Sequence, residues 1–255
     1  MAASSSRRLS YTLALGVTTV AYSPILAMAT AAFEILVAAW ALMGGGDRAL
    51  LRTTSLILFL LAGYQITEIA ICADVGAAGF LPRLAFIDVT WLPALGLVLV
   101  GQIYRPCSRL LRGIGGGMLV AAAGIVLWIL VDRAFASASV CSAVYARYTH
   151  AMPRFLAYSI YYWLGLFGMV SLSAFGALRT EGGRPRRLLT QVFAGTLGFI
   201  VPSFAVSWFV PAAARALPSV LCHFALILAV FLARMIWIER HSGSEESASA
   251  IGEAA

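Results

Sequence analysis

Seven long apolar runs constrain this chain more than any other feature of its sequence. A helix needs about 20 mainly apolar residues to cross the hydrocarbon core of a bilayer. The runs therefore predict an all-α fold, a polytopic membrane protein built as a bundle of about seven transmembrane helices. They lie at residues 11–43, 53–73, 84–104, 117–132, 155–178, 188–210 and 218–238.

Composition supports this architecture, because the chain carries too few charges for a water-soluble globule. Of its 255 residues, 61% are hydrophobic and 11% are charged, whereas about a quarter of an ordinary soluble domain is charged. We expect residues 1–241 to form one transmembrane domain in contact with the lipid bilayer, without a sizeable soluble domain. Residues 242–255 are rich in Ser, Glu, Gly and Ala and are expected to form a disordered cytoplasmic tail.

The first run, 11–43, is long for one crossing and begins like a secretory signal peptide. Two arginines precede it, and Ala27-Met28-Ala29 imitates a cleavage site. Cleavage there would leave about fourteen apolar residues of the run, which are too few for a full span. We therefore expect an uncleaved helix that is kinked at Pro24.

The basic residues predict the orientation in the membrane, because short cytoplasmic loops carry an excess of Lys and Arg. All eighteen basic residues are arginine. Eleven follow the first, third, fifth and last runs, and seven lie on the other side. This bias predicts a cell (inner) membrane protein with its C-terminus in the cytoplasm and its N-terminus outside, although Arg7 and Arg8 argue the other way.

The basic residues also exclude two classes of function. A retinal Schiff base requires a lysine amine, and the chain contains no lysine, so it is not a rhodopsin of that chemistry. The arginines are not interleaved with aromatic residues as on a nucleic-acid-binding surface. We therefore expect no nucleic-acid partner.

Polar residues inside the apolar runs form the candidate site, since a charge in hydrocarbon costs at least about 2.5–3.5 kcal/mol and usually faces a partner or a cavity. Gln65, Glu68 and Cys72 are spaced three and four apart and so share one helix face. At a rise of about 1.5 Å per residue, polar residues of three other runs lie at a similar depth in the outer half. We predict an outward-facing polar pocket that binds a small ligand, lipid or ion, for sensing or transport, and whose remaining candidates are Asp88, Trp91, Tyr161, Tyr162 and His223.

If Glu68 and Asp88 converge, the two carboxylates cannot comfortably both be ionised in a pocket of low dielectric constant. One of them would then hold a proton, pair with His223 or Arg154, or bind a cation. A separation of the three side chains well beyond about 10 Å would contradict the single pocket, because direct pairing needs close contact.

Two other interpretations of the same residues remain open. Glu68, Asp88 and His223 could bind zinc with His150 as a fourth ligand, in an intramembrane metal-dependent hydrolase that acts on lipid. The chain has three histidines and no HxxxH or HExxH spacing, which disfavours an enzyme and leaves no cofactor clearly indicated. Alternatively, the polar residues only hold helices together, in a structural partner subunit of a membrane complex or in a homo-oligomer.

Three features stand apart from the pocket. Glu34 lies near the middle of the first run and is either a proton relay or a hydrogen-bonding group toward a neighbouring helix. Cys72 and Cys141 both lie on the side predicted to be external, where a disulfide could form. Pro93 and Pro202 fall inside apolar runs, where each bends a helix.

Several short segments resemble uncharacterised bacterial seven-helix membrane proteins. They cover about three of the seven predicted helices, and the resemblance implies the fold without implying an activity. Alkaline ceramidases also have seven helices, but their histidine-rich zinc pattern is not reproduced in this chain. The segments are Gly63-Tyr64-Gln65-Ile66-Thr67-Glu68, Trp91-Leu92-Pro93, and Pro218-Ser219 with Cys222-His223.

Overall fold

The structure is a computed structural model that describes residues 23–73, 80–104, 108–141, 146–149, 152–210 and 217–253. Within these ranges it contains seven helices, each long and apolar enough to cross a membrane. This confirms the predicted all-α, multi-pass bundle. The helices are α1 (Ile25–Leu42), α2 (Arg48–Ala73), α3 (Leu81–Ile103), α4 (Ser108–Val131), α5 (Met152–Arg179), α6 (Gly183–Phe209) and α8 (Leu217–Glu253).

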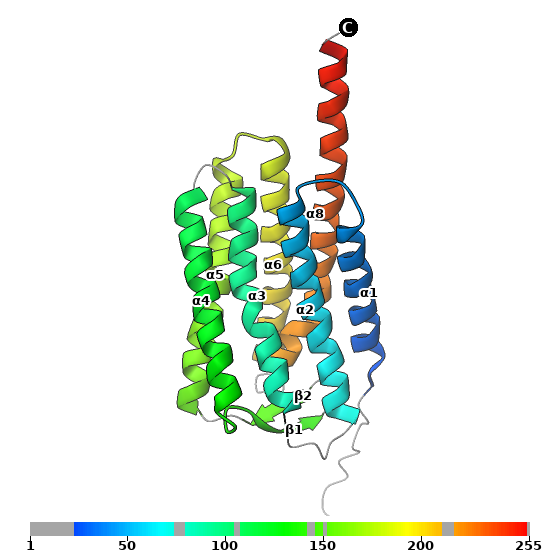
Figure 1. Ribbon diagram of the computed structural model, residues 1–255. Helices are drawn as coiled ribbons and strands as arrows, with labels where there is room; N and C mark the ends of the chain where they lie inside the picture. Colours follow the sequence, from blue (N-terminus) through cyan, green and yellow to red (C-terminus); the bar gives the residue numbers. More distant parts are fainter. Residues whose placement is uncertain are drawn as a thin grey trace, which may run out of the picture.

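Successive helices run up and down, so the bundle has two distinct ends (Figure 1). One end carries a short antiparallel hairpin of β1 (Ser137–Cys141) and β2 (Ala146–Thr149), and we call it the hairpin end. The other carries the α1–α2 turn and the far end of α8, and we call it the tail end. The hairpin was not predicted, because strands of five and four residues in a loop leave no long apolar run.

The first helix begins later than the sequence predicts. Pro24 immediately precedes α1 as its N-cap residue, instead of bending a longer helix from within. Proline lacks a backbone N–H, and its ring clashes with a preceding helical turn, so a helix starts readily after it. The predicted helix is present from Ile25 to Leu42, but the prediction that it continues through a kink at Pro24 is wrong, because Ser23 and Pro24 are not helical. Residues 1–22 lie outside the described part.

The second helix begins earlier than the apolar run because a side chain caps it. The Asp47 carboxylate accepts hydrogen bonds from the backbone N–H groups of Ala49 (3.0 Å) and Leu50 (3.3 Å). These donors have no partner within the helix itself, so an aspartate before the first turn stabilises its start. The turn from α1 to α2 is therefore short and well defined.

Small residues let neighbouring helices approach closely, as expected inside a membrane. A Cβ atom at Gly195 of α6 would lie 2.8 Å from Phe231 Cβ of α8, and one at Gly198 would lie 2.8 Å from Ile227 Cγ2. Neither position has room for a larger side chain without a shift of α8. The pairing of α6 with α8 therefore depends on both glycines.

The last helix extends beyond the rest of the bundle. In Figure 1 it projects past the other helices at the tail end, and it remains helical to Glu253. The segment 242–253 was expected to be disordered from its composition, whereas the structure continues α8 through it. Alanine and glutamate, which recur there, are good helix formers, so a helix already formed by the preceding residues can continue.

Candidate functional site

A chain of two hydrogen bonds joins α2, α8 and the hairpin. The Glu68 carboxylate of α2 is 0% exposed and accepts a hydrogen bond from the Ser219 hydroxyl of α8 at 2.5 Å. The Ser219 oxygen in turn accepts a hydrogen bond from the backbone N–H of Ala146 in β2 at 3.3 Å. We call this arrangement the Glu68 relay.

Two more side chains lie at the same contact between α2 and α8. Gln65, one turn before Glu68, donates from Nε2 to the backbone carbonyl of Cys222 at 2.7 Å. His223 donates from Nδ1 to the backbone carbonyl of Ser219 at 2.8 Å and interacts electrostatically with Glu68. The structure thus brings together three of the candidates, Gln65, Glu68 and His223, from two helices far apart in sequence.

Two tyrosines beside the relay were missed by the sequence reasoning. The hydroxyl groups of Tyr64 and Tyr148 are 3.2 Å apart, within hydrogen-bonding distance, and both residues are buried. Tyr64 precedes Glu68 by four residues, which places it on the same helix face, so its spacing could have identified it. Tyr148 lies in β2, and no helical period marks it.

A disulfide fixes the hairpin to the bundle. Cys72 in the last turn of α2 is bonded to Cys141 of β1, with Cα atoms 5.7 Å apart. This is the pairing expected from the sequence, and it closes a loop of 69 residues. The hairpin is therefore held by a covalent bond at Cys141 and by the hydrogen bond of Ala146 to the Glu68 relay.

Three carboxylates in the bundle have oxygen atoms without a hydrogen-bond partner among the described residues. They are Oε1 of Glu68, Oδ2 of Asp88 and both oxygens of Glu34. Asp88 faces α2, where a Cβ atom at Gly63 would lie 2.8 Å from its Oδ2. Cys222 of α8 interacts electrostatically with all three carboxylates.

The aromatic candidates pack together on α3 and α5. Tyr161 donates from its hydroxyl to the backbone carbonyl of Thr90 at 2.8 Å. This carbonyl lies in the turn before Pro93, where a proline interrupts the helical hydrogen bonds. Tyr161 also packs with Trp91 and Tyr162. The structure therefore brings the three aromatic candidates together from two helices.

Other predicted partners of the carboxylates lie elsewhere. Arg154, expected as a possible counter-charge, forms a salt bridge with Asp132 at 3.1 Å, because both residues lie at the turns that flank the hairpin. His150 lies outside the described residues. Within the described part, no three His, Cys, Asp or Glu side chains gather in an arrangement that could hold a metal ion.

The chemistry open to the Glu68 relay follows from its groups. Glu68 can take up or release a proton, and the hydroxyl of Ser219 can reorient, because it both donates and accepts. With Nδ1 of His223 donating, its Nε2 atom is an acceptor in the neutral ring.

No protein-family model matches the chain, and no curated protein matches it either.

Proposed function

We propose that this protein is a membrane-embedded proton sensor, in which Glu68 binds the proton and α8 carries the response. The observation that supports this proposal is the Glu68 relay, because one titratable carboxylate holds both α8 and the hairpin through Ser219. A change in the charge of Glu68 therefore acts on two structural elements at once. The ion of the expected pocket is, in this proposal, a proton.

Burial and hydrogen bonding favour a proton over a larger ligand. Glu68 is fully buried, and a carboxylate in that position needs a neutralising partner. A proton needs no additional space, and one oxygen of Glu68 is without a partner among the described residues. A hydrogen bond to an ionised carboxylate is roughly twice as strong as one between neutral groups, so protonation weakens the attachment of Ser219.

The continuity of α8 gives this local event a route to the opposite end. The helix runs without a break from Leu217 to Glu253, over 37 residues, which corresponds to roughly 55 Å. Ser219 lies in its first turn, and Glu239 contacts Asp47 in the α1–α2 turn at the tail end. A shift of α8 at Ser219 is therefore transmitted along a single helix.

We place the hairpin end outside the cell and the tail end in the cytoplasm. The Cys72–Cys141 disulfide belongs in an oxidising compartment. Of the arginines that the structure describes, ten belong to the tail end and four to the hairpin end, as the positive-inside rule requires. Both arguments agree. The sensor would then read external pH, with its responding end in the cytoplasm.

Cysteine labelling tests this orientation. In a Cys107→Ser background, we expect a membrane-impermeant maleimide to label Ala134→Cys on intact cells, because Ala134 is exposed in the turn before the hairpin. Gly45→Cys, whose Cβ position has no neighbour within 4 Å, should be labelled only after permeabilisation. Cys222 is buried and serves as an internal control. The reverse pattern would contradict the orientation.

Hydrogen exchange at the hairpin tests the sensor itself. After correction for the intrinsic effect of pH, the wild-type amide of Ala146 should exchange at different rates in acid and neutral buffer. Glu68→Gln should show the acid-like rate at every pH, because it mimics the protonated side chain, and Ser219→Ala should exchange fast throughout. Exposed Glu181 supplies the control, since Glu181→Gln should respond as wild type does. A normal pH response in Glu68→Gln would contradict the proposal.

Proton movement across the membrane is the second candidate, and Glu34 favours it. Its carboxylate is fully buried and has no hydrogen-bond partner among the described residues. Glu34 lies near the middle of α1. Proton flux in liposomes that disappears with Glu34→Gln would favour movement over sensing.

A further inference from the structure

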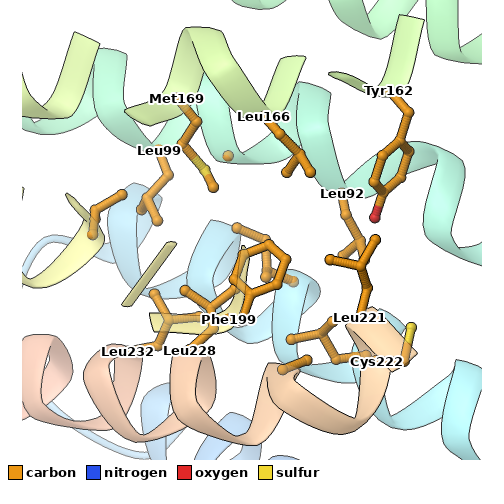
Figure 2. A pocket seen from close by; sticks show the side chains of 15 residues that line it. Leu92, Leu99, Tyr162, Leu166, Met169, Phe199, Leu221, Cys222, Leu228 and Leu232 are labelled. Carbon is orange, nitrogen blue, oxygen red and sulfur yellow. The ribbon is translucent and has the colours of Figure 1, made fainter. Parts of the chain in front are cut away.

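The middle of the bundle contains a cavity whose lining includes none of the three carboxylates. Its volume is about 30 Å³, and its walls come from α2, α3, α5, α6 and α8. Figure 2 shows Leu99, Met169 and Phe199 around it, with Leu92 and Cys222 toward one side. Neither Glu68, Asp88 nor His223 lines it.

Tyr162 gives this apolar cavity one strong hydrogen-bonding group. Apart from the thiol of Cys222, the other lining side chains are aliphatic, aromatic or thioether groups. The Tyr162 hydroxyl is drawn among the lining atoms, close to Leu92 (Figure 2). A buried phenol normally finds a partner.

The size of the cavity limits its occupant. A single water molecule needs roughly 10–15 Å³ of cavity volume. The cavity therefore accommodates about two or three atoms of the size of a water oxygen. Apolar walls disfavour a charged group, which would lose its hydration without compensation. The occupant must therefore be short and uncharged.

We propose that the cavity binds a small, mainly apolar molecule with one oxygen atom, of the size of a one- or two-carbon alcohol. The carbon atoms contact Leu99, Phe199 and Met169, and the oxygen accepts a hydrogen bond from Tyr162. This site goes beyond the proton sensor and uses different side chains.

Methionine methyl signals report binding directly. We would record NMR spectra of protein labelled with ¹³C in the methionine methyl groups, in lipid nanodiscs, and titrate ethanol as the oxygen-bearing probe and xenon as the apolar probe. Both should shift the Met169 signal, which Met169→Leu identifies, and both shifts should saturate. Tyr162→Phe should weaken ethanol binding about fivefold, as expected for one lost hydrogen bond, and leave xenon binding unchanged.

Two controls decide the outcome. Met28 of α1 is 57% exposed and reports the probe dissolved in lipid, so its shift should grow without saturation. Ala225→Leu, which adds volume inside the cavity, should abolish saturable shifts for both probes, and Val192→Leu replaces it if that variant does not fold. Unsaturable shifts at Met169, or equal ethanol affinity in Tyr162→Phe and wild type, would overturn the proposal.

Discussion

Replacing Gly165 with alanine should lower the free energy of unfolding by about 1–3 kcal/mol, the usual cost of overpacking. Gly165 lies where α5 crosses α3. A Cβ atom there would collide with Pro93 Cβ and would lie 3.4 Å from Pro93 Cα and 3.0 Å from Met118 Cε. The methionine can move aside, but the proline ring is fixed to its backbone. The two helices must therefore separate, and Gly165→Leu should prevent folding altogether.

A glycine on the exposed side of α4 provides the matched control. Gly116 is exposed, and no atom lies within 4 Å of its Cβ position. Gly116→Ala should be neutral or slightly stabilising, because alanine is the better helix former by up to about 1 kcal/mol. Both variants would be compared by thermal unfolding in the same detergent. Equal stability of the two alanine variants would show that α5 does not pack closely against Pro93.

Removing Glu239 should destabilise the tail end strongly. Its side chain is 1% exposed and accepts hydrogen bonds from Nε (2.7 Å) and Nη2 of Arg184 and from the backbone N–H of Asp47 (2.8 Å). Breaking a buried ion pair costs roughly 3–5 kcal/mol, because it leaves the partner charge uncompensated. The Arg184 side chain is 33% exposed, so water offsets part of this loss. We expect Glu239→Ala to fall at the lower end of that range.

The contribution of the ion pair can be separated from other effects of the substitution. Glu239→Ala, Arg184→Ala and the double variant form a cycle whose interaction energy isolates the pair. Glu181→Ala removes an exposed acid in the neighbouring α5–α6 turn and should change stability little. If Glu239→Ala lowered the thermal unfolding temperature no more than Glu181→Ala, the stability of the tail end would not depend on this contact.

The features that the sequence predicted well are local ones. The number of helices follows from runs of apolar residues, because the bilayer fixes the length of each span. The stripe of Gln65 and Glu68 follows from helical spacing within a single element. The boundaries were less predictable, since the side-chain cap of Asp47 and the backbone restriction of Pro24 set two helix starts, and hydropathy reports neither.

The candidate site was only partly predictable. The depth of a residue in the membrane can be counted along its own helix, but the sequence does not show which helices are neighbours. Glu68, Tyr161 and His223 were assigned to one level, yet Tyr161 faces Thr90 of α3 while Glu68 faces Ser219 of α8. The role of Ala146 depends on its backbone N–H, which no side-chain pattern reveals. The Glu68 relay could therefore be identified only from the packed bundle.

Difference infrared spectroscopy tests the proton-binding role of Glu68 most directly. Carboxylic acids and carboxylates absorb at separate frequencies, so a pH titration of the protein in lipid follows its buried carboxyl groups. The proposal predicts a carboxylic-acid band that changes with pH in wild type and in Glu181→Gln, and that is missing in Glu68→Gln. An identical set of titrating bands in wild type and Glu68→Gln would contradict it.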